Sequence, residues 1–152
     1  MEIERKFLVK ARPPNWKGRS GSKIRQGYFH LCAKDLEIRL REKGSQCFIT
    51  VKSGHGKVRR EEEIRISREH FKHLWPLVRG ASVVKTRYRL PHAGRIIELN
   101  VYGGRHRGLM TAEVEFPSTR NSNSFEPPEW LGREITEDRR YSNESLANRG
   151  RP

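Results

Sequence analysis

The sequence is poor in cysteine and has no long hydrophobic run. Its two cysteines, Cys32 and Cys47, lie in no CxxC pattern and near no pair of histidines. This spacing excludes the usual zinc and redox motifs and predicts two reduced structural thiols. No apolar stretch approaches the length of a membrane span, and the N-terminus lacks the basic-then-apolar pattern of a secretory signal. These absences predict a cytoplasmic protein with no membrane partner.

Apolar residues are also scarce, at 34% of the chain against 33% charged residues. Such a composition raises the question of disorder. Disorder is excluded because short alternating segments recur as far as about residue 116, and three Trp, six Phe and four Tyr supply large side chains for a core. We therefore predict one folded domain over residues 1–146, with residues 147–152 as a frayed tail.

Acidic residues are outnumbered as well: the chain has 18 Asp and Glu but 32 Lys and Arg, which gives a net charge of +14. A surface of this sign attracts polyanions. Nucleic acid, an anionic membrane and phosphorylated small molecules all remain open at this point.

The charged residues alternate with aliphatic ones in segment after segment. Leu36, Ile38 and Leu40 share one face of an extended strand, and Arg39 and Arg41 share the other. The N-terminal segment behaves in the same way and places Glu2, Glu4 and Lys6 together. About eight such strands are expected, together with a helix after Ser67, a loop over residues 117–128 and a short helix ending near Leu146.

A closed barrel would remove the exposed edges of these strands. Two closures are open: aliphatic side chains inside, or charged side chains inside and aliphatic ones covered by helices and loops. A charged interior requires an opposite charge or a metal. Basic groups suit phosphate oxygens, and clustered carboxylates suit Mg²⁺ or Mn²⁺, so the mixed rows favour a metal-chelated oligophosphate as the guest.

The charged segments also resemble a known family. Residues 2–9 resemble the ExExK signature of CYTH, or triphosphate tunnel metalloenzyme, proteins. Seven further segments follow in the order found in that family: residues 38–41, 50–52, 60–64, 85–88, 98–102, 112–116 and 134–138. The resemblance covers nearly the whole chain and is closest to the small stand-alone bacterial members.

This resemblance implies a mainly β (α+β) fold, namely a closed eight-stranded antiparallel barrel that forms a tunnel with a charged lumen. Helices would pack outside it, and a C-terminal helix would plug one end. The implied phosphate-binding residues are Lys6, Arg39, Arg41, Lys52, Lys85 and Arg87. The implied metal ligands for Mg²⁺ or Mn²⁺ are Glu2, Glu4, Glu61, Glu63, Glu98, Glu113 and Glu115. Glu2, Glu4 and Lys6 would be catalytic, and Asp138 and Tyr141 would help to close the tunnel.

The function implied is metal-dependent hydrolysis of inorganic triphosphate, with a small-molecule substrate and a monomer or homodimer as the active form. Thiamine triphosphate and nucleoside triphosphates are alternatives at the same site. One residue departs from the family pattern, since Asn100 stands where Asp is usual, and an amide would bind a metal or water less strongly.

A rival of another class is a non-catalytic binder of polyphosphate or nucleic acid that uses the outer basic residues Arg105, Arg107, Arg139, Arg140 and Arg149. Aromatic residues are sparse in those stretches, so nucleic acid is disfavoured as a partner.

Overall fold

A computed structural model describes residues 3–14, 16–54 and 60–152. The strands are β1 (Ile3–Val9), β2 (Ser22–Tyr28), β3 (Leu36–Lys43), β4 (Gln46–Ser53), β5 (Arg60–Ile66), β6 (Ser82–His92), β7 (Arg95–Tyr102), β8 (Met110–Phe116) and β9 (Leu131–Glu134). The helices are α1 (Arg68–Val78), α2 (Thr119–Ser124) and α3 (Asn143–Arg149), with single 3-10 turns η1 (Arg79–Ala81), η2 (Gly104–His106) and η3 (Arg139–Tyr141). The fold is therefore mainly β.

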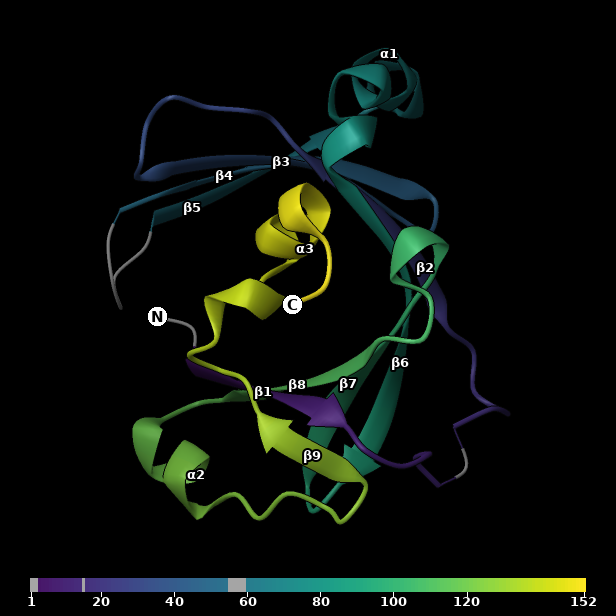
Figure 1. Cartoon of the computed structure of the whole chain (residues 1–152), viewed down its shortest axis with the longest axis vertical. Coiled ribbons are helices and arrows are strands. Elements are labelled where there is room, and N and C mark those ends of the chain that lie inside the picture. The colour runs from purple at the N-terminus through teal and green to yellow at the C-terminus, as the bar shows by residue number, and fades with distance from the viewer. Residues whose placement is uncertain (1–2, 15, 55–59) are drawn as a thin grey trace.

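The strands form one antiparallel sheet in the order β5-β4-β3-β2-β6-β7-β8-β1-β9. The prediction of eight strands is wrong, because Leu131–Glu134 adds a ninth strand to β1. The predicted closure is also wrong, since no strand pairing in the described part of the chain joins β5 to β9. The sheet instead curls into an open trough, and Figure 1 shows it curving around α3 with α1 and α2 outside.

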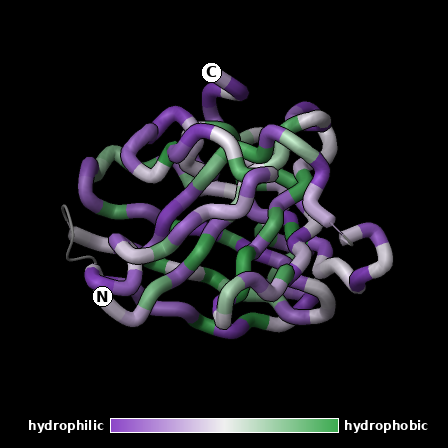
Figure 2. Tube along the Cα trace, turned by 90° about the horizontal axis from the view of Figure 1, so that it is seen from below, coloured by the Kyte–Doolittle hydropathy of each residue, from purple (hydrophilic) through white to green (hydrophobic). Residues whose placement is uncertain are grey.

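The predicted alternation is confirmed in the strands, and Figure 2 shows polar and apolar residues following one another along the trace. In β3, Leu40 is buried against Phe71 and Val78 of α1 on the convex side. Its neighbours Arg39 and Arg41 point to the opposite, concave side because successive side chains of a strand alternate. The charged rows thus line the trough.

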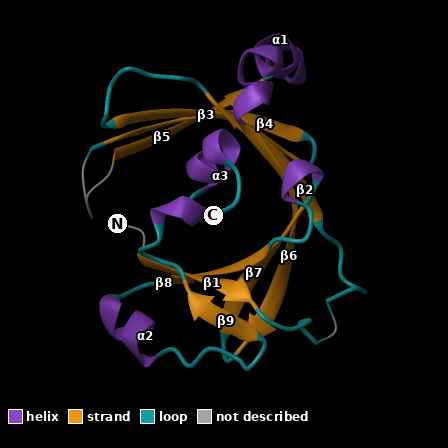
Figure 3. Cartoon of the chain, in the orientation of Figure 1, coloured by secondary structure: helices purple, strands orange, loops and turns teal. Residues whose placement is uncertain are grey.

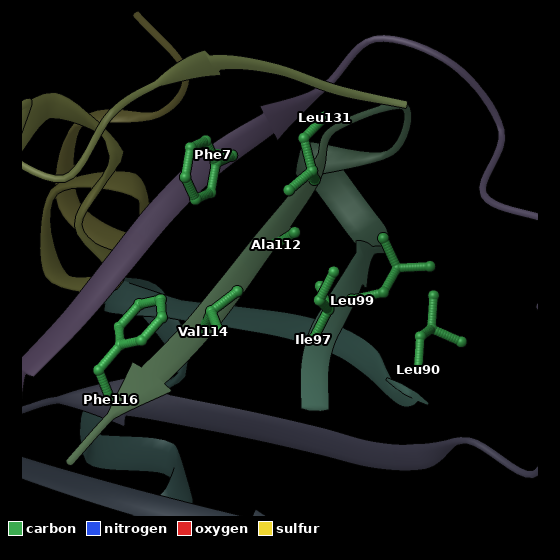
Figure 4. Close-up of a cluster of buried hydrophobic side chains, with 8 residues drawn as sticks. All are labelled: Phe7, Leu90, Ile97, Leu99, Ala112, Val114, Phe116 and Leu131. Carbon is green, nitrogen blue, oxygen red and sulfur yellow. The ribbon is translucent and has the colours of Figure 1, made fainter. Parts of the chain in front are cut away.

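An apolar cluster covers the convex side of β1, β7 and β8. Figure 4 shows its members: Phe7, Leu90, Ile97, Leu99, Ala112, Val114, Phe116 and Leu131. Phe125, from the segment after α2, and Trp130 pack over this cluster. Burial of these side chains removes the aliphatic face of the strands from water, which stabilises the curved sheet from its convex side.

The helices begin at side-chain caps. Ser67 caps α1 as predicted, accepting a hydrogen bond of 3.0 Å from the His70 amide. Pro76 does not end α1, which continues to Val78. Helix α2 lies in the predicted loop over residues 117–128 and is capped by Ser118.

Helix α3 lies inside the curve of the sheet, as Figure 3 shows. Its Leu146 and Ala147 are fully buried against Tyr28, Val83 and Tyr102. The predicted end near Leu146 and the frayed segment from residue 147 are wrong, because the helix continues to Arg149 and buries Ala147.

Candidate active site

The candidate site occupies the concave face of the sheet, where five basic side chains converge around one buried carboxylate. Lys6 comes from β1, Arg39 and Arg41 from β3, and Lys85 and Arg87 from β6, while Glu113 comes from β8. Glu113 lies opposite Lys6 in one strand pair and opposite Glu98 in the other. Residues distant in sequence therefore meet because strand pairing places them side by side.

Arg87 is held by three acceptors. Its Nε donates to Asn100 Oδ1 at 2.9 Å, its Nη1 lies 2.9 Å from Glu98 Oε2, and its Nη2 lies 3.1 Å from Glu113 Oε2. Every edge of the guanidinium is thus engaged, which fixes the plane of a group suited to bidentate phosphate recognition.

Glu113 is the counter-charge at the centre of the site. It is only 7% exposed and lies 3.4 Å from Lys6 Nζ. Burial alone would raise its pKa, but the charges of Lys85, Lys6 and Arg87 outweigh burial and lower the pKa to about 2. Glu113 is therefore a carboxylate under ordinary conditions.

The two lysines are tied to the C-terminal segment. Lys6 Nζ donates to the Tyr141 carbonyl at 3.0 Å, and Lys85 Nζ donates to Asn143 Oδ1 at 3.3 Å. Tyr102 donates its hydroxyl to the same Asn143 oxygen at 2.7 Å. Burial lowers the pKa of the Lys85 ammonium well below its usual value, so an anion beside it would favour the charged form.

Arg39 and Arg41 lie on the concave side of β3, next to β2 and β4. Arg41 Nε donates to Gln26 Oε1 at 2.9 Å. Burial, together with the charges of Arg39 and Arg87, lowers the pKa of Arg41 to about 10. Three cations this close repel one another, and a bound polyanion would relieve that repulsion.

Arg39 carries an unused donor. Its Nε is buried and makes no hydrogen bond. Among the residues that the structure describes, it is the one buried side-chain nitrogen or oxygen atom in this state. Its Nη2 makes a long contact of 3.5 Å to Thr50 Oγ1. A buried donor of this kind is costly unless a ligand accepts from it, so Arg39 points to a ligand rich in oxygen.

The carboxylates near β1 are candidate ligands for a metal ion. Burial raises the pKa of Glu4 to about 7, and repulsion from Glu113 and Glu115 adds to the effect. A divalent cation would relieve this repulsion, and oxygen donors are the ligands that Mg²⁺ and Mn²⁺ prefer, so the donor set fits such an ion. In the part of the chain described here, no three His, Cys, Asp or Glu side chains gather into a complete site. The predicted ligand Glu2 lies outside the described residues.

The remaining predicted residues have partners of their own. Lys52 Nζ lies 3.8 Å from Glu61 Oε2, and Glu63 accepts a long hydrogen bond of 3.4 Å from Thr50. These pairs line the wall formed by β4 and β5.

Asp138 accepts hydrogen bonds from Arg140 and Arg133, which lowers the pKa of Asp138 and holds the turn that carries Tyr141.

Sequence reasoning missed four polar contributors to the site: Gln26, Thr50, Tyr102 and Asn143. Gln26 and Thr50 alternate with residues of the opposite face in β2 and β4, and this alternation was the available signal. Tyr102 stood in a segment that the family resemblance had already marked. Asn143 had no signal, because its role depends on α3 entering the trough.

The outer basic surface of the rival hypothesis is partly occupied. Arg105 Nη2 donates to the Leu146 carbonyl at 3.0 Å and also to the Ala147 carbonyl. Arg140 is paired with Asp138 at 2.7 Å. Two of the five arginines thus serve the C-terminal segment, which weakens the rival hypothesis.

Among the described residues, no helix combines the length and apolar character needed to span a membrane.

A relative from Nitrosomonas europaea named inorganic triphosphatase is 45% identical over 148 residues, which are 96% of each chain. One from Acetivibrio thermocellus with the same name is 33% identical over 95% of this chain and 92% of its own.

A solved structure described as an inorganic triphosphatase superimposes with a TM-score of 0.78 at 42% identity, covering 97% of this chain and 94% of its own. The sequence profile of the CYTH domain matches residues 1–150. The match agrees with the charged trough and with the order of the sequence motifs, and the chain belongs to the CYTH domain family.

Proposed function

We propose that this chain is an inorganic triphosphatase that hydrolyses tripolyphosphate to pyrophosphate and phosphate with Mg²⁺ or Mn²⁺. The observation that carries the proposal is the convergence of Lys6, Arg39, Arg41, Lys85 and Arg87 on one concave face around Glu113. The names of the relatives from Nitrosomonas europaea and Acetivibrio thermocellus support the same substrate.

The basic residues bind and orient the phosphate chain. Arg39 offers the unpaired Nε, and Lys85 gains a partner that stabilises its charge. Arg87 exchanges part of its contact with Glu98 and Glu113 for phosphoryl oxygens. Phosphoryl transfer asks a protein chiefly for positioning and for charge neutralisation, and this set of side chains supplies both.

Glu4 and Glu113, with Glu115 beside them, would hold the metal. When bound, a divalent cation neutralises charge on the phosphoryl oxygens and lowers the pKa of a coordinated water. Mg²⁺ and Mn²⁺ fit because the donors are carboxylate oxygens.

Glu4 also suits the orientation of the attacking water. In the metal-free protein its pKa is about 7, so above neutral pH its carboxylate is available to accept a hydrogen bond from water or to bind the cation. Lys6 lies on the same face of β1 and supplies positive charge beside Glu113. Glu2 stays a proposed ligand on the family resemblance alone.

The test is release of phosphate from tripolyphosphate with and without Mg²⁺ or Mn²⁺, comparing wild type with Glu4→Gln and Arg41→Ala. Both variants should lose about a hundredfold or more in kcat/KM, since each removes a charged contact to the reacting groups. Arg60→Ala is the matched control, because Arg60 is exposed on the convex side of β5 and should leave the rate unchanged. Undiminished rates in both site variants would remove the trough from the mechanism.

Organic triphosphates are a second candidate class of substrate at the same site. A pocket of about 370 Å³ lies at the β3–β4 turn and is lined by Arg41, Phe48 and Lys43, among others. Phe48 is an aromatic surface on an otherwise charged wall, and an aromatic ring accepts stacking by a nucleobase or the rings of thiamine. A panel of tripolyphosphate, ATP, GTP and thiamine triphosphate, compared by kcat/KM, decides between the substrates. A preference for an organic triphosphate that Phe48→Ala abolishes would favour this second candidate.

A further inference from the structure

Two arginines of the trough share an arrangement that their charges alone do not require. In each, the Nε atom donates to the side-chain oxygen of a fully buried carboxamide on the adjacent strand, at 2.9 Å. Gln26 serves Arg41, and Asn100 serves Arg87. Both carboxamides are 0% exposed.

Each carboxamide is itself oriented by a hydroxyl. Gln26 Nε2 donates to Tyr28 OH at 2.8 Å, and Asn100 Nδ2 donates to Thr111 Oγ1 at 3.4 Å. Because an arginine has only donors, the amide oxygen must face it, and the amide nitrogen must then find an acceptor on its other side. The hydroxyls of Tyr28 and Thr111 supply that acceptor.

Strand register builds both units in the same way. Gln26 lies directly opposite Arg41 in the pair of β2 with β3, and Asn100 lies directly opposite Arg87 in the pair of β7 with β6. Asn100 is also directly opposite Thr111 of β8. Each unit therefore belongs to the rigid sheet and depends on no loop.

We propose that Gln26 and Asn100 are positioning residues that hold the guanidinium planes of Arg41 and Arg87 in the orientation that grips the phosphate chain. This inference rests on the proposed function and adds two residues to it. A neutral acceptor on Nε fixes the plane and leaves the terminal nitrogens for partners in the trough. It does so without cancelling the positive charge that a polyanion requires.

A carboxylate in the same place would also fix the plane, but it would compete with phosphate for the charge. Arg87 already faces two carboxylates, Glu98 and Glu113. These can turn to a metal ion when the ligand arrives, whereas the contact with Asn100 is retained. The amide at position 100 thus has a role of its own in the alignment of Arg87.

The first test compares Asn100→Ala with Leu99→Ala. Leu99 directly precedes Asn100 in β7, is equally buried and faces the convex core. The Leu99→Ala variant therefore reproduces a loss of packing without touching Arg87. We expect Asn100→Ala to raise the KM for tripolyphosphate about tenfold, the loss typical of a hydrogen bond to a charged group. Leu99→Ala should lower the melting temperature and leave KM unchanged. Equal KM values in the two variants would overturn the proposal.

The variant Asn100→Asp retains the acceptor on Nε but adds a negative charge beside Arg87, so its KM should lie between the values of wild type and Asn100→Ala. Impairment as large as that of Asn100→Ala would contradict a role in alignment.

The second test is a double-mutant cycle on Gln26 and Arg41. Gln26→Ala should raise KM about tenfold in the wild-type background and less than about twofold in the Arg41→Lys background, because lysine has no Nε–H plane for Gln26 to hold. Equal effects in both backgrounds would mean that Gln26 does not act through Arg41, and the inference would fail.

Calorimetric titration of wild type and of each single variant with tripolyphosphate in metal-free buffer gives a readout that does not depend on turnover. Dissociation constants should follow the same order as the KM values. If wild type neither binds nor hydrolyses tripolyphosphate, the proposed function fails. If wild type does both and Asn100→Ala and Gln26→Ala match it, the carboxamide inference alone fails.

Discussion

Replacement of Glu113 by Gln removes a buried carboxylate that faces three cations. Lys6 and Arg87 contact it directly at 3.4 and 3.1 Å, and the charge of Lys85 also acts on it. Gln has nearly the same shape, but it carries no charge and turns an amide toward one of these donors. The variant should therefore lose stability, because removal of one partner leaves buried charges uncompensated.

The size of the loss follows from the pKa of Glu113. The folded protein lowers that pKa from 4.5 to about 2, and at about 1.4 kcal/mol per pKa unit the carboxylate contributes about 3 kcal/mol at pH 7. Since the folded-state pKa is lowered, this stability is complete above pH 4.5 and is lost as the pH falls toward 2. At pH 3, less than half of it should remain.

Urea unfolding of wild type and Glu113→Gln at pH 7 and pH 3 measures this contribution. The difference in free energy of unfolding should be about 3 kcal/mol at pH 7 and should shrink by about half or more at pH 3. In metal-free buffer, tripolyphosphate should raise the melting temperature of the variant more than that of wild type, because it supplies the missing negative charge.

Glu62→Gln is the control, since Glu62 is exposed on the convex side of β5 and its variant should stay within about 0.5 kcal/mol of wild type. A loss below about 1 kcal/mol for Glu113→Gln at pH 7, or a difference independent of pH, would refute the electrostatic reasoning.

Three further predictions concern other parts of the molecule. Because burial and repulsion from Glu113 raise the pKa of Glu4 to about 7 in the metal-free protein, affinity for Mg²⁺ should rise as the pH passes upward through about 7, and calorimetric titration of Glu4→Gln with Mg²⁺ should lack this rise. Asn143→Ala leaves Lys85 and the Tyr102 hydroxyl without their acceptor and should cost about 1–3 kcal/mol in urea unfolding. Gly27→Ala would place a Cβ 2.5 Å from Val78 Cγ2 and should destabilise by about 1–3 kcal/mol in thermal unfolding, whereas Gly80→Ala meets open space and should not.

Which charged residues share one face was predictable from the sequence because it depends on a local period. In β3, Glu37, Arg39 and Arg41 alternate with aliphatic residues, and in β8 Glu113 and Glu115 flank Val114 in the same way. No arrangement of the sheet changes which residues share a face. Arg39 and Glu113 both line the trough because this period puts each on the charged face of its strand and the folded sheet has its charged face on the concave side.

The number of strands and the closure of the sheet were not predictable in the same way. Leu131–Glu134 is too short to show a clear alternation, and it becomes a strand because β1 offers it an unpaired edge. Helix α2 is likewise short and polar, and its Ser118 cap was the available signal in a segment otherwise rich in Ser and Asn.

The period of the sequence determined which side chains share a face, and the sum of its charges determined that the face would attract a polyanion. The tertiary structure decided which of these side chains touch. Gln26 meets Arg41 through strand register, while Asn143 meets Lys85 because α3 enters the trough. Periodicity is a property of neighbours in the chain, whereas the partner of a buried charge is set by strand pairing and by the position of α3, which bring together residues far apart in sequence.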